Sequence, residues 1–168
     1  MKEVSFKNDI LPLKDVLFRL AMRITLNRED AEDIVQETLV KLWNETQDKE
    51  IENLKAFALT ICRNLALDHN ALKEHQNISL DETIHEQVDY SRSPDEEIES
   101  KERYGYLKAL INSLPEKQRT AIQLRDVEGR SYKEIAEIMG IGESDVKVNI
   151  FRGRQRLKER LSRLGNKQ

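Results

Sequence analysis

The sequence has very few of the residues that build catalytic and metal sites. Its 168 residues include one cysteine, Cys62, and three histidines, and none of them stands at a metal-ligand or catalytic spacing. A disulfide within the chain and a zinc cluster are therefore excluded, and the apolar helical pattern around Cys62 favours a buried structural thiol. There is also no glycine-rich phosphate loop and no H-E-x-x-H pattern. We accordingly predict no catalytic residue, no bound metal and no cofactor, and we expect that the chain is not an enzyme by itself.

Long apolar runs and chain breakers are scarce as well. No apolar run approaches the length that spans a membrane, and the first residues lack a signal-peptide core. We therefore expect a cytoplasmic protein that is not embedded in a membrane. Only 6 glycines and 3 prolines interrupt the chain, and aromatic residues make up 5% of it. The scarcity of glycine and proline favours helices throughout. The low aromatic content provides no prominent stacking platform for single-stranded nucleic acid.

The N-terminal part predicts three amphipathic helices. Apolar residues recur there at helical spacing in three stretches, residues 10–26, 28–43 and 54–72. The second and third stretches begin after residues that can cap a helix, Asn27 and Asn53. A polar loop is expected between them at residues 44–52. The three helices can close one small core, in a domain of residues 1–77.

Charge is distributed unevenly along the chain. Residues 110–168 hold 13 Lys and Arg and 8 Asp and Glu, a net charge of +5, whereas the whole chain carries −3. The remaining 109 residues therefore carry −8, and we expect the two parts to meet different partners. Residues 78–94 open an acidic stretch without a sustained apolar period, which predicts a flexible linker. A second domain of residues 95–168 would follow it.

The second domain predicts a helix-turn-helix. Ser131 and Glu134 form the S-x-x-E pattern of a capping box, and Gly140 is the residue type that most easily ends a helix. After a three-residue turn a second helix begins near Glu143, and its tail is rich in cations. This arrangement is typical of a module that places its second helix in the DNA major groove. A basic amphipathic helix can also be a solvated face, and charge alone leaves both interpretations open.

Two segments together resemble one family, the bacterial RNA polymerase sigma factors of the small, two-domain, extracytoplasmic-function class. Residues 30–43, D-A-E-D-I-V-Q-E-T-L-V-K-L-W, look like the most recognisable helix of that family. Residues 114–119, L-P-E-K-Q-R, and the stretch that continues to Ala136 look like the opening of its C-terminal domain. The resemblance covers roughly residues 11–161. It implies an all-α fold of two small helical domains joined by an acidic linker, the second domain containing the helix-turn-helix.

The resemblance implies that the exposed polar face of residues 30–43 docks on the coiled coil of the largest polymerase subunit. Trp43 would be an anchor at the edge of this face. The residues implied in polymerase binding are Asp33, Gln36, Glu37, Thr38, Lys41 and Trp43. Without the resemblance, the same face would be interpreted as an ordinary solvated one.

Two further surfaces are implied to meet promoter DNA. The third helix would recognise the melted −10 element through Arg63, Asn64 and Lys73, and loop residues 45–52 would tune which base fits. The helix-turn-helix would bind the −35 element as duplex. Because residues advance by about 100° along a helix, the three arginines of the second helix fan across about 200°, and only some can face DNA. The residues implied at the −35 element are Glu143, Ser144, Lys147, Val148, Asn149, Arg152, Arg154 and Arg156.

The expected function is therefore a sigma factor that binds core RNA polymerase, directs it to specific promoters and assists their opening. An anti-sigma factor is an expected partner besides polymerase and promoter DNA, and no small-molecule substrate is expected. Two alternatives stay open, a stand-alone helix-turn-helix regulator and a decoy that binds polymerase without supporting transcription. The acidic linker has two interpretations, a solvated tether and a mimic of RNA in the polymerase channel. We expect the free chain to be held off DNA by packing of its two domains or by the anti-sigma partner.

Overall fold

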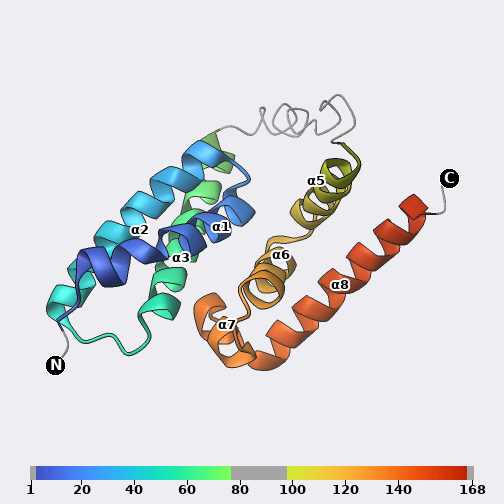
Figure 1. The fold of residues 1–168 in the computed structure, drawn as a ribbon. Coiled ribbons are helices and arrows are strands. Elements are labelled where there is room, and N and C mark those ends of the chain that lie inside the picture. The colour runs from blue at the N-terminus through green and yellow to red at the C-terminus, as the bar shows by residue number, and fades with distance from the viewer. Residues whose placement is uncertain (1–2, 77–97, 166–168) are drawn as a thin grey trace.

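The computed structural model describes residues 3–76 and 98–165, and it is helical in both parts (Figure 1). The first part, here called the N-terminal unit, contains the π-helical turn η1 (Phe6–Ile10), the 3-10 turn η2 (Leu11–Leu13), α1 (Lys14–Thr25), α2 (Arg28–Asp48) and α3 (Leu54–Gln76). The second part, the C-terminal unit, contains α5 (Ile98–Asn112), α6 (Glu116–Ile122), the π-helical turn η4 (Gln123–Val127), α7 (Tyr132–Met139) and α8 (Glu143–Gly165). The all-α prediction is confirmed, and the predicted linker at residues 78–94 lies outside the described residues.

Two helices of the N-terminal unit begin at the capping residues that the sequence predicts. The side-chain oxygen of Asn27 accepts from the Asp30 amide at 3.0 Å, and that of Asn53 accepts from the Ala56 amide at 3.1 Å. Both predicted caps are confirmed. Three helices then bury one apolar face each, and each buried Leu or Ile adds about 1.5–3 kcal/mol of transfer free energy. The fully buried side chains include Leu17, Leu20, Ile24, Leu42 and Leu59.

The predicted loop at residues 44–52 is wrong in its first half. Helix α2 continues to Asp48, five residues beyond Trp43. This segment contains no glycine or proline, so nothing in it stops the helix once the apolar stripe has ended. Glu45 and Lys49 support the extension with an ion pair at i and i+4, 3.0 Å apart.

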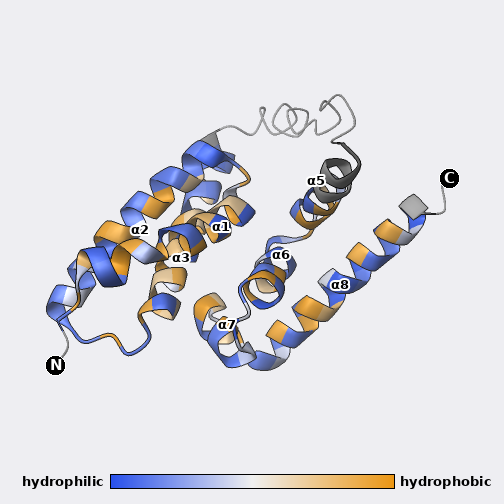
Figure 2. Ribbon diagram, in the orientation of Figure 1, coloured by the Kyte–Doolittle hydropathy of each residue, from blue (hydrophilic) through white to orange (hydrophobic). Residues whose placement is uncertain are grey.

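The C-terminal unit contains the predicted helix-turn-helix. The hydroxyl of Ser131 accepts from the Glu134 amide at 3.1 Å, and Gly140 closes α7 in the left-handed conformation at φ 66°. The other half of the expected capping box is absent from the described contacts, because the Glu134 carboxylate accepts from Arg130 at 3.3 Å. Figure 2 shows polar and apolar residues alternating along α8, as an amphipathic helix requires. Val146 and Ile150 are the buried residues near its start.

The two units pack against each other. Helix α3 lies against α7, and α1 lies against α6 and η4. Polar side chains bridge the same boundary: Arg19 donates to both carboxylate oxygens of Glu128, at 2.7 and 2.9 Å, and Arg23 donates to Gln123 at 3.0 Å. The structure therefore shows the two units packed together; that this packing holds the free chain off DNA stays a prediction.

A glycine sets how closely α8 crosses α6. Gly153 is buried, and a Cβ atom added there would overlap the Cδ1 of Ile122, which is itself only 3% exposed. Leucine is a far better helix former than glycine, so propensity alone would favour it. We nevertheless predict that Gly153→Leu lowers the free energy of unfolding by about 1–3 kcal/mol, because the helices must separate to accept it. Chemical denaturation followed by circular dichroism measures this change.

Gly142→Ser is the matched control for that substitution. Gly142 is exposed and precedes α8, where serine is an equally good cap, so we expect unchanged or slightly higher stability. A Gly153→Leu variant as stable as the wild type would contradict the close crossing.

Candidate nucleic-acid interface

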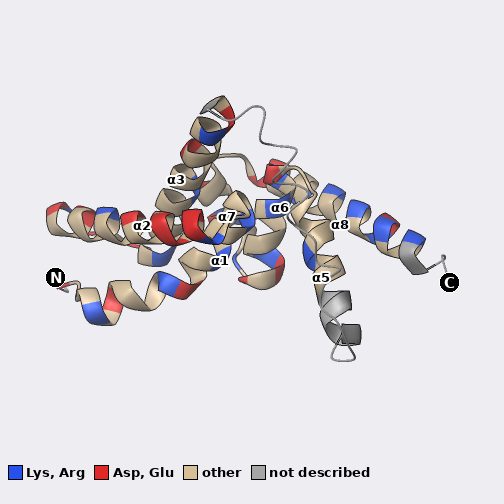
Figure 3. Cartoon of the chain, turned by 90° about the horizontal axis from the view of Figure 1, so that it is seen from above, with Lys and Arg blue, Asp and Glu red and all other residues tan. Residues whose placement is uncertain are grey.

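Helix α8 presents one buried and one exposed face at its N-terminal end. The apolar anchors Val146 and Ile150 fix it against α7 and the rest of the C-terminal unit. Figure 3 shows Lys and Arg recurring along the helix. The predicted −35 residues that are exposed are Glu143, Ser144, Lys147, Val148, Arg152, Arg154 and Arg156. This face is open to a ligand, because its side chains are exposed while α8 packs chiefly on α6 and α7.

The three arginines of α8 differ in what they contact. Arg154 is held by both carboxylate oxygens of Asp126, one of them 3.1 Å from its Nε, which raises the pKa of its guanidinium. Arg152 and Arg156 are exposed, and neither has an ion-pair partner among the described residues. Asn149 is half-buried and donates to the Asp145 carbonyl at 2.8 Å. The structure thus separates Arg154 and Asn149 from the open cationic face.

Sequence reasoning missed one cation beside this face. The guanidinium of Arg125 lies over the Tyr132 ring, 4.2 Å from its centroid, and the ammonium of Lys147 lies over the same ring at 5.3 Å. Tyr132 therefore contacts one cation from η4 and one from α8. No helical periodicity signals Arg125, because its place depends on this tertiary contact.

Half of the residues predicted to bind polymerase line a groove between α2 and α3. Asp33, Gln36 and Glu37 line it, and its volume is about 560 Å³. Sequence reasoning missed Val40, which lines the same groove and is 58% exposed. Val40 could have been identified from the sequence, because it is an apolar residue outside the buried stripe of α2. Leu65 and His69 of α3 complete the wall.

Three other residues predicted to bind polymerase lie elsewhere. The expected exposure of Thr38 is wrong: its side chain is completely buried, and its hydroxyl donates to the Ile34 carbonyl at 2.6 Å. Trp43 is half-buried and packs edge-on against Phe6, with ring centroids 5.7 Å apart, so it supports η1 instead of projecting from the edge of the docking face. Lys41 is exposed but does not line the groove.

The predicted −10 residues have three different environments. Asn64 is exposed on α3, as an amide that reads a base edge must be. Lys73 is half-buried and its ammonium lies 2.9 Å from Asp30. Arg63 was expected to meet DNA phosphates, yet it is only 6% exposed and donates to Glu116 and to the Met139 carbonyl of the C-terminal unit. In this packed form Arg63 is therefore unavailable to DNA.

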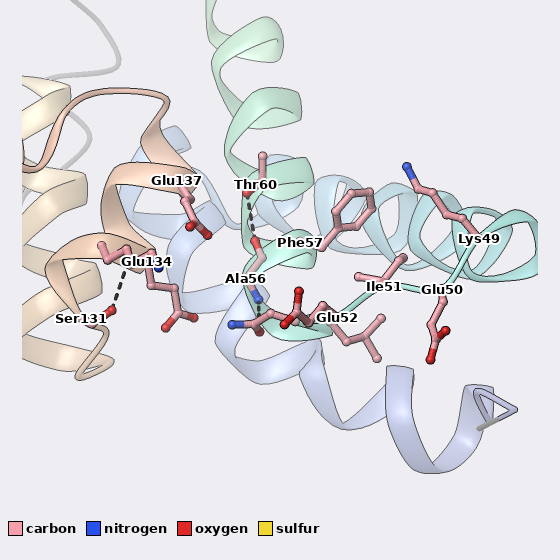
Figure 4. Close-up of a pocket in the computed structure, with 13 residues that line it drawn as sticks. Lys49, Glu50, Ile51, Glu52, Ala56, Phe57, Thr60, Ser131, Glu134 and Glu137 are labelled. Carbon is pink, nitrogen blue, oxygen red and sulfur yellow. Dashed lines mark hydrogen bonds between the residues drawn. The ribbon is translucent and has the colours of Figure 1, made fainter. Parts of the chain in front are cut away.

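A cleft lies where the α2–α3 loop meets α7 (Figure 4). Its volume is about 930 Å³, and residues 49–54 form one wall while Ser131 and three charged residues of α7 form the other. Its carboxylates, from both walls, are Glu50, Glu52, Glu134 and Glu137. The loop expected to recognise a −10 base thus borders an acidic cleft.

Comparison with known proteins assigns both units to one family. The family model for Sigma-70 region 2 matches residues 10–74, and that for Sigma-70 region 4 matches residues 104–157. The ECF RNA polymerase sigma factor SigL of Mycobacterium tuberculosis is 30% identical over 152 residues, which cover 89% of this chain and 85% of SigL. The chain belongs to the ECF sigma factors. The fold and family that the sequence resemblance predicted are confirmed.

Other relatives of this sigma factor differ in length and in bound partners. The ECF sigma factor SigE of Mycolicibacterium smegmatis is 34% identical over 89% of this chain, but the match spans only 58% of SigE. The solved sigma factor RpoE of Bartonella quintana, in complex with the anti-sigma factor NepR, is 27% identical with a TM-score of 0.69, covering 94% of this chain and 96% of RpoE. Among the described residues of this sigma factor, no helix is long and apolar enough to cross a membrane.

The thiol on α3 lies in the core of the folded sigma factor. Cys62 is completely buried, its Sγ lies 3.4 Å from the Leu17 carbonyl, and burial raises the pKa of the thiol to about 12. We predict that a chromogenic disulfide reagent at pH 8 leaves Cys62 unmodified and that denaturant makes it react fully, because the reagent attacks the thiolate. An Asp48→Cys variant, with an exposed thiol, is the control and should react at once. Rapid modification of native Cys62 would show that the core around α3 is open.

Proposed function

We propose that this sigma factor binds core RNA polymerase in the cytoplasm, directs it to specific promoters and assists promoter opening, without performing a catalytic step itself. The observation that supports it best is the presence of separate surfaces on units that match regions 2 and 4. One is the groove on α2, one is the exposed amide of Asn64 on α3, and one is the cationic face of α8. A stand-alone regulator would need only the last of these.

The α2 groove is the proposed polymerase site. Asp33 and Glu37 give it negative charges, and Gln36 adds an uncharged hydrogen-bonding group. Val40 provides exposed apolar area among them. An apolar centre surrounded by polar contacts that exclude water is the usual composition of an interface hot spot. Lys41 would contribute at the margin, Trp43 would act only by holding α2 against η1, and Thr38 would not contact polymerase.

The exposed face of α8 is the proposed −35 site. Lys147, Arg152 and Arg156 would neutralise phosphates, and Arg125 would join them from η4. Glu143, Ser144 and Val148, at the N-terminal end of α8, would approach base edges in the major groove. Asn64, and Lys73 about two and a half turns further along α3, are proposed at the −10 element. An anti-sigma factor is proposed as the regulatory partner, since the matched RpoE structure contains one.

Polymerase binding should depend on the α2 groove. We predict that Asp33→Ala combined with Gln36→Ala weakens binding to core polymerase by tenfold or more, since each lost interface contact of this kind removes about 1 kcal/mol or more. Titration of labelled protein with core polymerase measures the affinity. Thr38→Val is the control, because this buried side chain cannot reach a partner and its loss should leave the affinity unchanged. Equal affinities for the double variant and the wild type would contradict the docking site.

Duplex binding should depend on the open cations of α8. Replacing Lys147 and Arg152 with alanine should weaken binding to promoter duplex and lower its salt slope by up to about two, because each lost phosphate contact removes about one released counterion. Arg154→Ala is the matched control, since Arg154 already pairs with Asp126 and its loss should change the slope little. A slope that falls only in the control would contradict this assignment and give the phosphate contact to Arg154.

Transcription with core polymerase tests the whole function. The purified chain and core polymerase from its source are combined with the DNA upstream of its own gene. A defined transcript that requires the chain is the expected result. Stable polymerase binding without a transcript from any promoter fragment would favour a decoy, and tight duplex binding without polymerase binding would favour a stand-alone regulator.

A further inference from the structure

We propose that Arg63 is a latch with two alternative ligands: a carboxylate of the C-terminal unit in the closed chain and DNA phosphate in the open one. The closed chain would thereby withhold its −10 surface while leaving its −35 surface available. This inference rests on the proposed function, and it adds an order to the two DNA contacts, duplex first and melted strand second.

Arg63 is held by the C-terminal unit from two sides. Its Nη2 and Nε donate to the two carboxylate oxygens of Glu116, at 3.0 and 3.3 Å, and its Nη1 donates to the Met139 carbonyl at 3.1 Å. Met139 ends α7, where helix carbonyls lack partners within the helix and carry partial negative charge. The side chain of Arg63 is only 8% exposed, so these three contacts replace nearly all of its water.

The ligands of Arg63 resemble phosphate in their chemistry. A guanidinium binds carboxylates and phosphates with the same planar pair of N–H donors, so phosphate can substitute for Glu116. Arg63 precedes Asn64 on α3, the residue proposed to read a −10 base. When α7 leaves α3, the freed cation therefore lies next to the base-reading amide. No segment of the N-terminal unit among the described residues offers Arg63 another carboxylate.

The packed α7 also repels DNA from the same surface. Glu134 and Glu137 of α7 line the cleft opposite Glu50 and Glu52 of the α2–α3 loop (Figure 4). Only two cations, Lys49 and Lys133, line the cleft with these four acids. A phosphate entering the cleft would meet net negative charge from both walls. Opening removes the α7 acids and frees Arg63 in one movement.

The exposed face of α8 does not take part in this closure. Lys147, Arg152 and Arg156 remain exposed while the units are packed. The closed chain can therefore meet a −35 duplex, whereas the phosphates of single-stranded DNA reach Arg63 only after the units separate. A ligand that binds only the open form has its apparent affinity reduced by the fraction of chain that is open.

The latch predicts how one carboxylate controls the opening. Spin labels at Asp48→Cys and Lys158→Cys, both exposed, report the distance between the units while buried Cys62 stays unlabelled. We expect one narrow distance distribution in the otherwise wild-type protein, and a second, separate population when Glu116→Ala is introduced. Glu137→Ala removes the same charge from the same boundary without touching Arg63, and it should keep the single narrow distribution.

Binding to fluorescent oligo(dT) of 20 nucleotides tests the second ligand. Glu116→Ala should bind it about tenfold more tightly than wild type, because a larger open fraction removes the conformational penalty. Arg63→Ala should also open the chain but gain less affinity than Glu116→Ala, because it removes the cation that binds phosphate. Arg63→Ala combined with Glu116→Ala should bind no better than Arg63→Ala alone. Glu116→Gln repeats the test with a side chain of the same shape, should the alanine variant lose helicity.

Two outcomes would overturn the latch. One is an unchanged distance distribution and unchanged oligo(dT) affinity in folded Glu116→Ala. The other is an equal gain in affinity for Arg63→Ala, which would assign the effect to lost repulsion alone. The distance measurement uses the free chain and needs neither polymerase nor promoter. If Glu116→Ala changes the distance distribution but the wild type supports no transcription, the proposed function is rejected and the latch is kept. If the wild type supports transcription but Glu116→Ala leaves the distances unchanged, only the latch is rejected.

Discussion

The arrangement of the two units depends on a guanidinium buried at their boundary. Removing a cation from water costs several kcal/mol unless carboxylates and carbonyls replace the lost hydrogen bonds. Arg63 has such replacements only while Glu116 and the end of α7 stay against α3. A partly separated boundary would leave the charge buried without partners. The boundary is therefore stable when it is closed or when it is open enough for water, and intermediate separations are disfavoured.

The two parts of the chain carry net charges of opposite sign, and the ion pairs between them have the reverse polarity. The acidic N-terminal part supplies the arginines at the boundary, Arg19, Arg23 and Arg63, and the basic C-terminal part supplies acceptors such as Glu128. Burial would raise the pKa of Glu128, but the hydrogen bond and charge of Arg19 outweigh it and hold that pKa below its usual value. In these ion pairs each unit supplies its minority charge, whereas the cleft at the same boundary also contains the acids Glu50 and Glu52 of the N-terminal unit.

Features decided within one turn of the chain could be predicted from the sequence. The caps at Asn27, Asn53 and Ser131 are of this kind, because each needs only its own side chain and an amide three residues on. Thr38 was misplaced because threonine suits either face of a helix, and its hydroxyl is satisfied by its own backbone. The burial of Arg63 could not be predicted, because its partner Glu116 is 53 residues away. For the same reason the sequence indicated which residues could form each candidate site, but not which are free in the packed chain.

Helix α8 joins the DNA-reading end of the molecule to its far end without interruption. Its 23 residues correspond to a rod about 34 Å long. The rod is seated at Gly153, where it crosses α6, and Arg160 near its other end contacts Ser113, just after α5. The crossing at Gly153 lies near the middle of α8, so it can act as a pivot for the helix. Because the helix is continuous, a duplex that tilted α8 about this crossing would also shift Arg160 relative to Ser113.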